Sequence, residues 1–277
     1  MHFEEQAQTI VCGDQQLIGV LARPTQPATR GVLIIVGGPQ YRAGSHRQFT
    51  LLARHLAGRG VPVLRFDYRG MGDSDGDSRS FEDVNQDVRA AIDHFFASVS
   101  QLREVALWGL CDGASAALFY AAQDARVRGL ALLNPWARTE AGAAQATLKH
   151  YYRRRLLQPE LWRKLLAGRF DAAAAWRSLR VLLAASRQAM PAQDQSLPAR
   201  LYRGWQAFNG PVLLMLSGAD LTAREFAALA DSTPEWRALL ARDVTTRREL
   251  AGADHTCSRA VWRDQIADWT SDWVRAW

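Results

Sequence analysis

Residues 105–113 read VALWGLCDG, and this stretch decides which fold the chain adopts. Its first four apolar residues predict a strand, and the small residues that follow it, 114–122 (ASAALFYAA), predict a helix. Glycines two positions before and after Cys111 leave room for a sharp turn that holds the residue between them at a strained backbone position. The pattern predicts a nucleophile elbow with cysteine where serine usually stands.

Cys111 has two interpretations. Free cysteine is among the most buried residue types, and the glycine spacing alone can arise by chance. At the start of a helix, however, unpaired N–H groups and the helix dipole favour the thiolate, which is a nucleophile. The residues that follow favour the second interpretation, because an elbow architecture places nucleophile, acid and histidine in that order along the chain.

The acid of that order has two candidates. Residues 211–220 (PVLLMLSGAD) predict a buried strand that ends in a small-residue turn and presents Asp220. Asp254 lies directly beside a histidine, a position better suited to orienting the histidine loop. We therefore favour Asp220 as the acid.

The histidine is expected in residues 249–255 (ELAGADH), which predict a loop before the last amphipathic helix. His255 alone follows a strand and an acid. The other histidines, which lie at the terminus, in helical patterns or in a basic stretch, are His2, His46, His55, His94 and His150. We expect Cys111, His255 and Asp220 to serve together as nucleophile, base and orienting acid.

Strands and helices alternate along the first half of the chain. Apolar runs predict strands at residues 17–22, 31–36, 61–66, 105–108, 129–133 and 211–217. Helical patterns at residues 47–57 and 81–96 fall between them, which favours a mainly parallel sheet with helices on both faces. The first two runs have no helix between them, so we expect them to form an antiparallel edge.

The alternation stops between residues 136 and 208, where about seventy residues predict helices only, too many for an ordinary loop. A chain of 277 residues can hold one large α/β domain with such an insertion. We expect residues 1–135 and 209–277 to form the core and residues 136–208 a helical cap.

The expected cap is basic. It holds 13 Lys and Arg against 4 Asp and Glu, a net charge of +9, and the rest of the chain has −3. Its densest part is KHYYRRR at residues 149–155. A solvated helix face is the usual explanation; the alternative is docking of an anionic group such as coenzyme A, an acidic carrier protein or a membrane surface. Nucleic acid is not expected, because no recognition motif accompanies the charge.

The cysteines and the N-terminal residues indicate the cellular compartment in which we expect the protein. Cys12, Cys111 and Cys257 are too few for a disulfide framework, and no CxxC pair indicates a metal, so we expect no metal or other cofactor and a reducing cytoplasm. The first residues, MHFEE, begin no apolar segment that would predict a signal peptide or a membrane span.

An oxyanion hole needs backbone N–H groups near the reacting carbonyl. One donor is expected from Asp112, directly after the elbow cysteine. The second is expected from residues 37–42 (GGPQYR), where Pro39 has no N–H and Gln40 is the better donor by elimination. Gly38 lets the backbone approach a substrate, although Pro39 and Gln40 fit an ordinary turn equally well.

Residues 65–74 (RFDYRGMGDS) predict a strand end and a glycine-rich loop with a structural role, and phosphate binding is the weaker alternative.

Five segments together resemble the exosortase A system-associated hydrolase 1 group of the α/β-hydrolase superfamily. They are GGPQYR at 37–42, FDYRGMGDS at 66–74, GLCD at 109–112, NPW at 134–136 and LTAREF at 221–226. The resemblance implies the α/β-hydrolase fold with Cys111, Asp220 and His255 at the superfamily's nucleophile, acid and base positions. It also implies a Gram-negative bacterium with exopolysaccharide and protein-sorting genes nearby, where acyl-activating enzymes and carrier proteins are often encoded. The residues expected to bind substrate are Gly38, Pro39, Arg42 and Trp136.

The chain departs from the commoner superfamily pattern by its cysteine and by the lack of a leading His-Gly before the oxyanion loop, which argues against ordinary esterase activity. We expect acyl transfer through a thioester on Cys111, because a thiolate expels alkoxide poorly but reacts well with thioesters and strained lactones. Thioesterase or acyltransferase activity, with a coenzyme A or carrier-protein donor, therefore ranks first. The alternatives are lactone opening of the dienelactone hydrolase type, with Arg42 or Arg69 holding a substrate carboxylate, and a binding or scaffold protein without catalysis.

Overall fold

The computed structural model describes residues 2–38, 40–137 and 196–277. The chain divides into two compact units, Met1–Ala137 with Leu201–Trp277, and Arg138–Arg200. The sheet and the site described below belong to the first unit.

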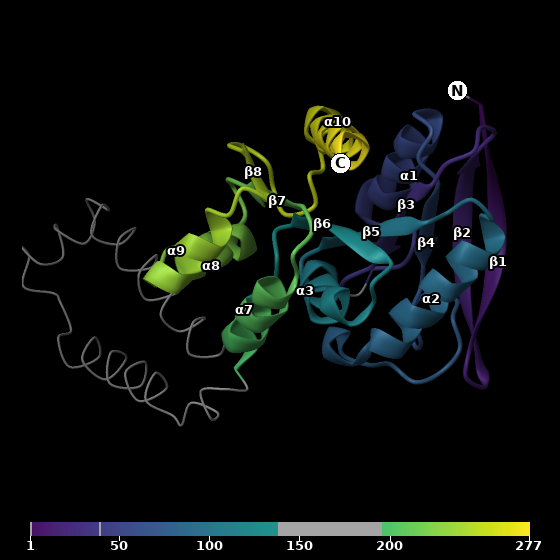
Figure 1. Ribbon diagram of the computed structural model, residues 1–277, viewed down its shortest axis with the longest axis horizontal. Coiled ribbons are helices and arrows are strands. Elements are labelled where there is room, and N and C mark those ends of the chain that lie inside the picture. Colours follow the sequence, from purple (N-terminus) through teal and green to yellow (C-terminus); the bar gives the residue numbers. More distant parts are fainter. Residues whose placement is uncertain (1, 39, 138–195) are drawn as a thin grey trace, which may run out of the picture. The chain divides into compact units, whose positions relative to one another are not determined.

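An eight-stranded sheet forms the centre of this unit (Figure 1). Its spatial order is β1-β2-β4-β3-β5-β6-β7-β8. The strands span Phe3–Cys12 (β1), Gln15–Pro24 (β2), Arg30–Ile35 (β3), Val63–Phe66 (β4), Glu104–Leu110 (β5), Val127–Leu133 (β6), Val212–Ser217 (β7) and Thr245–Leu250 (β8). From β4 to β8 neighbouring strands are parallel, as the alternation of strands and helices predicts.

The sequence analysis did not predict the strands β1 and β8, and both lie at the edges of the sheet. Most side chains of β1 are exposed or half-buried, and β8 reads TTRREL with only its last residue buried. Edge strands carry polar residues because water covers part of their surface, so an apolar run does not reveal them.

The expected antiparallel edge is present, but with different partners. Residues 17–22 were expected beside residues 31–36, whereas β2 pairs antiparallel with β1 and β4, and β4 separates it from β3. A two-residue turn at Gly13 and Asp14 joins β1 to β2 as a hairpin. The helix after β3 carries the chain over to a parallel position in β4, which takes the place beside β2.

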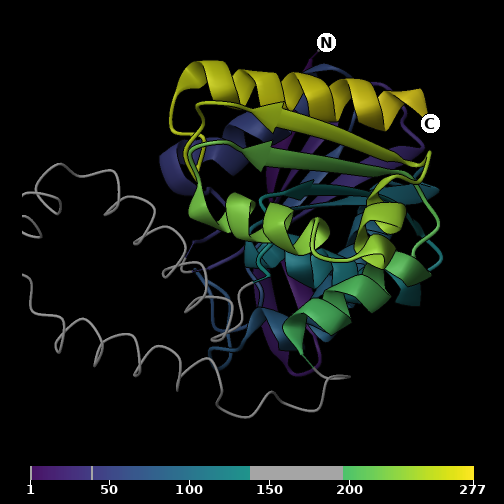
Figure 2. The same cartoon turned by 90° about the vertical axis from the view of Figure 1, so that its left-hand side faces the viewer.

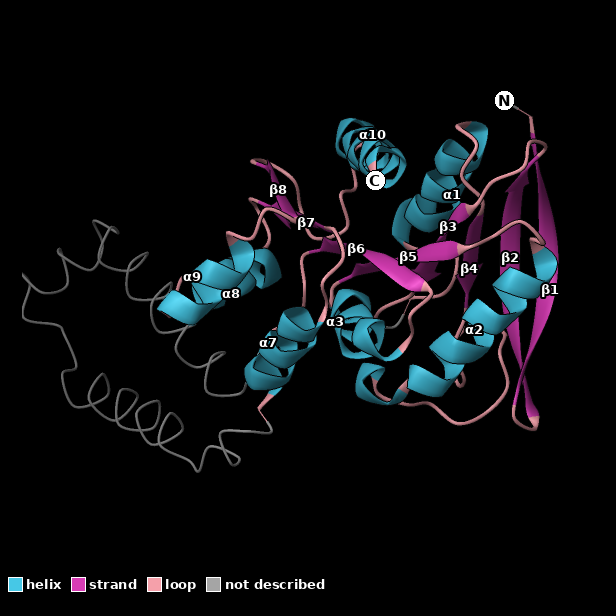
Figure 3. Cartoon of the chain, viewed as in Figure 1, coloured by secondary structure: helices cyan, strands magenta, loops and turns pink. Residues whose placement is uncertain are grey.

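Helices cover both faces of the sheet (Figures 1 and 2). Helices α1 (Gln48–Gly58) and α10 (Ala260–Ala276) contact each other on one face. On the other face lie α2 (Asn85–Ser98), α3 (Asp112–Tyr120), α8 (Leu221–Ala230) and α9 (Pro234–Leu240), together with the part of α7 (Leu197–Ala207) that belongs to this unit (Figure 3). None of the helices in the described ranges is long and apolar enough to cross a membrane.

The two predicted early helices are confirmed with shifted bounds. The second was expected from residue 81, but Phe81–Asp83 forms a 3-10 turn, and Val84 leaves helical geometry before α2 begins.

Packing under α1 and α10 fixes the strand that leads to Cys111. Trp108 of β5 is 2% exposed and lies edge-on to Phe49 of α1, with ring centroids 5.8 Å apart. Its indole N–H donates to Thr270 Oγ1 of α10 at 3.3 Å. Trp108 therefore packs against both helices on this face, near the end of the strand that leads to Cys111.

The predicted cap, residues 136–208, falls mostly on residues outside the described ranges, so its helical content and its role stay predictions. Within its described end, Leu201 is fully buried and Trp205 stacks on Phe226 of α8 with centroids 6.0 Å apart.

Candidate active site

Cys111 lies between β5 and α3 in a backbone conformation that residues with side chains rarely adopt, with φ 60° and ψ −124°. A Cβ on Gly113 would come within 2.5 Å of the Ile35 carbonyl oxygen, and one on Gly109 would overlap the backbone of Gly113 and Ala114. Both flanking positions therefore accept only glycine, which is the reason for the spacing in the sequence. The geometry is that of the strained strand-to-helix turn predicted for this stretch.

Asp220 lies three residues after the end of β7 and caps the N-terminus of α8. Its carboxylate accepts hydrogen bonds from the N–H groups of Thr222 at 3.3 Å and Ala223 at 3.1 Å. The same carboxylate accepts the His255 Nδ1–H at 2.9 Å. Burial alone would raise the pKa of Asp220, but the hydrogen bond from His255 and those from the helix amides outweigh it and lower the pKa.

Asp254, the other acid considered, points elsewhere. Its two carboxylate oxygens accept hydrogen bonds from the N–H and the hydroxyl of Ser258, at 3.0 and 2.5 Å. The Asp254 carboxylate therefore stabilises the turn that follows His255. Asp220 is the acid that contacts the imidazole.

The Cys111 side chain interacts with the His255 imidazole. Asp220 first, and Cys111 second, raise the pKa of His255 to about 10 against the opposing effect of burial. The raised pKa makes this imidazole a stronger base. Three side chains that follow β5, β7 and β8 thus meet at one place.

A pocket of about 420 Å³ opens above these groups. It is lined by Gly37, Gly38, Gln40, Phe81, Leu110, Cys111, Asp112, Trp136 and His255. Six of these were expected as site residues; Phe81 was not, because its segment was interpreted as the start of a helix. Pro39 lies outside the described residues, and Asp220 lies behind His255.

The loop after β3 meets the first residue of α3. Asp112 begins this helix, where N–H groups lack intrahelical partners, as expected for an oxyanion donor. The Gly38 N–H donates to the Asp112 carboxylate at 2.8 Å. The Gln40 side-chain oxygen accepts from Gln48 Nε2 at 3.3 Å and from the Ser45 N–H at 3.4 Å. No pattern in the sequence predicts the contact between Asp112 and Gly38.

Arg42 is not brought into the pocket. Its guanidinium pairs with Asp67 and, at 2.5 Å, with Asp73. Asp67 is 0% exposed and also accepts the Arg42 backbone N–H at 2.6 Å. The expectation that Arg42 contacts substrate is therefore not supported, because two carboxylates already occupy it.

Arg69 is likewise occupied. It donates to both oxygens of the buried Asp87 at 2.9 Å and to Gln86 at 2.8 Å. Within the same loop Ser74 donates its hydroxyl to the Asp67 carbonyl at 2.6 Å. These contacts agree with the structural role expected for residues 65–74.

Asn134, which follows β6, is a site residue that the sequence analysis did not single out for chemistry. It is fully buried at φ 47°, and its amide group donates to Ser217 Oγ at 3.0 Å and to the His255 carbonyl at 3.3 Å. Its side-chain oxygen accepts the Ser217 N–H at 2.8 Å. The available signal was a polar residue directly after a buried strand, beside a proline.

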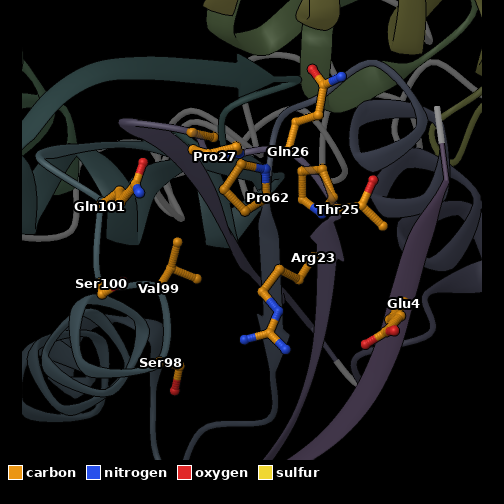
Figure 4. Close-up of a pocket in the computed structure, with 12 residues that line it drawn as sticks. Glu4, Arg23, Thr25, Gln26, Pro27, Pro62, Ser98, Val99, Ser100 and Gln101 are labelled. Atoms are coloured by element: carbon orange, nitrogen blue, oxygen red, sulfur yellow. The ribbon is translucent and has the colours of Figure 1, made fainter.

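A second pocket of about the same volume, 420 Å³, lies at the opposite end of the strands (Figure 4). Pro62 precedes β4, and Val99 and Gln101 precede β5. Ligands in open α/β sheets bind beyond the carboxyl ends of the strands, which is where the Cys111 pocket lies.

Comparisons with known proteins agree with this fold. Among solved structures, the chain is similar to an esterase of Pyrococcus furiosus (15% identity, 99% of this chain and 92% of that chain, TM-score 0.68). It is also similar to Est1E of Butyrivibrio proteoclasticus with bound ferulic acid (17%, 97% and 98%, TM-score 0.65) and to a dienelactone hydrolase of Anabaena variabilis (15%, 100% and 99%, TM-score 0.61). At these identities the likeness shows the fold alone.

Among curated proteins, the polyketide transferase grgF of a Penicillium species is 29% identical over 117 residues. The match spans 39% of this chain and 38% of that protein's length. The sequence matches the alpha/beta hydrolase family over residues 32–269.

Proposed function

The chain belongs to the alpha/beta hydrolase family, and on that premise we propose that it transfers acyl groups through a covalent thioester on Cys111. The observation that carries the proposal is a cysteine at a strained elbow whose side chain interacts with His255, which in turn donates to Asp220 at 2.9 Å. A nucleophile, a base and an orienting group in this order are the parts that covalent catalysis needs.

The proposed reaction has two halves. The proton of the Cys111 thiol passes to His255, and the sulfur attacks the carbonyl carbon of the substrate. When the intermediate collapses, the bond to the leaving thiolate breaks and His255 returns the proton to that group. Water or another acceptor, deprotonated by the same imidazole, then attacks the acyl-cysteine and releases Cys111. The N–H groups of Asp112 and Gln40 are the proposed donors to the oxyanion.

Activated acyl substrates, and thioesters first, fit a thiol nucleophile better than simple esters. Thiolates of similar basicity exchange readily, whereas alkoxide is a poor leaving group from a tetrahedral carbon that also bears sulfur. The polyketide transferase among the relatives supports transfer to an acceptor as an outcome besides hydrolysis. Thioesterase and acyltransferase activities are therefore proposed together, and the acceptor distinguishes them.

The charge of the chain suggests the donor. The 73 residues from 136 to 208 carry a net charge of +9, which supports attraction of a phosphopantetheine-bearing donor such as coenzyme A or an acyl carrier protein. The motif resemblance supports membership in the exosortase A system-associated hydrolase 1 group and a link to exopolysaccharide genes. Three free cysteines support a cytoplasmic location.

Lactone opening of the dienelactone hydrolase type is the weaker candidate. That reaction calls for a cation to hold a substrate carboxylate, and Arg42 and Arg69 are engaged by Asp67, Asp73 and Asp87. The described lining of the Cys111 pocket contains neither arginine nor lysine. A scaffold without catalysis is disfavoured because Cys111 and His255 interact and line one pocket.

The test is to incubate the purified protein with acyl thioesters or with lactones. Acylation is measured from the intact mass of the protein, and thioester turnover from the released thiol. We expect one acyl group on Cys111, thioesters turned over faster than lactones, and neither adduct nor turnover with Cys111→Ala. Cys111→Ser is the control for thiol chemistry, because it keeps the elbow and changes the atom. Wild type without adduct and without turnover, or a Cys111→Ser variant as active as wild type, would contradict the proposal.

A further inference from the structure

Asp112 lines the Cys111 pocket, and the roles described above use only its backbone N–H. Among the described lining residues it is the one acidic side chain. The rest of that lining, apart from the Cys111–His255 pair and Gln40, consists of glycine backbone and the apolar side chains Phe81, Leu110 and Trp136.

Backbone amides hold this carboxylate in place. Oδ2 accepts the Gly38 N–H at 2.8 Å, and Oδ1 accepts the Gly113 N–H at 3.1 Å. A Cβ on Gly37 would overlap Oδ1 and come within 2.7 Å of the Gly113 nitrogen, so this residue must be glycine for the carboxylate to fit. The loop after β3 and the start of α3 are thus shaped around the Asp112 side chain.

The carboxylate has amide partners but no guanidinium partner of the kind that neutralises Asp67. None of the ion pairs between residues of the described ranges involves Asp112, and the charged group that acts on its carboxylate is His255. Burial raises the pKa of Asp112, and the N–H groups of Gly38 and Gly113 offset part of that rise. Burial first, then the charge of Asp112, also raises the pKa of the neighbouring Tyr68 to about 12.

A carboxylate offers about four lone-pair sites to hydrogen-bond donors. Amide N–H groups occupy part of this capacity, and Asp112 is one of the residues that line the pocket. A hydroxyl or amino group on an entering molecule would find an acceptor there. A second carboxylate would meet like charge close to Cys111, with Arg42 and Arg69 already bound to other acids.

We propose that the Asp112 carboxylate determines which acyl groups reach Cys111: it admits acyl groups that are uncharged or carry a hydroxyl or amino donor, and it rejects acyl groups that carry a carboxylate. This inference rests on the proposed acyl transfer at Cys111 and adds its substrate class. It predicts, for example, that 3-hydroxyacyl and aminoacyl thioesters are accepted and dicarboxylic acyl thioesters are refused.

The test that needs no turnover compares two alkylating reagents of nearly equal size and different charge. The Cys111 sulfur attacks the methylene carbon of iodoacetamide or iodoacetate and expels iodide, and the rate at Cys111 is read by peptide mass spectrometry. The ratio of the iodoacetamide rate to the iodoacetate rate is measured for wild type, Asp112→Asn, Asp112→Ala and Asp73→Asn. The last variant is the matched control, since it removes one carboxylate from an exposed side chain outside the pocket lining.

We expect the ratio to fall about tenfold when the charge at position 112 is removed and to stay unchanged in Asp73→Asn. Asp112→Ala guards against an effect of a misplaced amide in Asp112→Asn, and circular dichroism with thermal unfolding shows whether each variant is folded. An equal ratio in wild type and both position-112 variants would overturn the proposal. Failure of both reagents to label wild-type Cys111 would overturn it as well, because an acyl group of that size would not reach the sulfur either.

The second arm uses N-acetylcysteamine thioesters of butyrate, 3-hydroxybutyrate and succinate, whose shared leaving group is uncharged. Wild type is expected to favour the first two over the succinyl thioester by about tenfold or more in kcat/KM, and Asp112→Ala to narrow that gap. If kcat/KM of Asp112→Ala falls by the same factor for all three thioesters, the role of Asp112 is purely structural. Absence of turnover with a charge-dependent alkylation ratio would refute the proposed function and leave the charge selection standing.

Discussion

Two carboxylates, the buried Asp67 and the half-buried Asp112, follow strands of the same sheet and are held in different ways. Asp67, after β4, pairs with Arg42 and accepts backbone N–H groups of Arg42 and Asp73 at 2.6 and 3.3 Å. Asp112, after β5, is held by amides alone and lines the pocket of Cys111. A buried charge that is fully neutralised stabilises a loop, whereas one left without a cation can act on what enters. The cluster of Asp67, Arg42 and Asp73 (the Asp67 cluster) is therefore assigned a structural role, and Asp112 is assigned a chemical role in the Cys111 pocket.

The largest expected effect tests the chemical side of this comparison. Replacing Cys111 by alanine should lower kcat/KM with an acyl thioester at least about 10³-fold, because the covalent route is lost. The free energy of unfolding, measured by urea titration, should change little, since the thiol is only half-buried. Stability lost in proportion to activity would remove the distinction between the two regions.

The next effect concerns the pair behind Cys111. Asp220→Asn should lower kcat by about 10² to 10⁴, since the imidazole loses its orienting acceptor. Because Asp220 and Cys111 raise the pKa of His255 to about 10, their contribution to stability is complete below the pKa of an unfolded histidine, near 6.5, and is lost as pH rises through 10. Urea midpoints measured from pH 6 to 10 should therefore fall less steeply in Asp220→Asn than in wild type; equal slopes would speak against the shift.

On the structural side, Asp67→Asn should destabilise the fold by about 3 kcal/mol, because the half-buried Arg42 guanidinium loses its main partner. Asp73→Asn, at the exposed end of the same cluster, should cost less than about 1 kcal/mol. Both values come from urea unfolding. A variant at Asp67 that unfolds like wild type but alters the charge selection of Cys111 would place this cluster in the site instead.

Asn134 belongs to both regions, and its expected effect is the smallest. It is buried like Asp67, yet its amide reaches the His255 carbonyl at 3.3 Å, so it is a positioning residue for the imidazole. Asn134→Ala should reduce kcat about tenfold with KM unchanged and lower stability by about 1 to 3 kcal/mol. Ser217→Ala removes the neighbouring partner without touching His255 directly, and an equal loss of kcat there would assign Asn134 to stability only.

The elements that were predicted correctly share a local cause. Buried parallel strands such as β5 and β7 are apolar along their whole length, and they stand out in the sequence for that reason. The polar edge strands β1 and β8 have no such pattern. The pairing of β2 with β4 depends on a crossover through α1, which strand patterns alone do not specify.

For the site, the sequence by itself determined the elbow and the order of cysteine, acid and histidine. The reason is that the turn at Cys111 is built from residues within two positions of it, where Gly109 and Gly113 prevent clashes. Only the tertiary structure decided that Asp220 and not Asp254 meets His255, that Arg42 is bound to Asp67, and that the Asp112 carboxylate meets the Gly38 amide. These choices join loops 35, 25 and 74 residues apart in the chain, and such contacts follow from how the strands are ordered in the sheet.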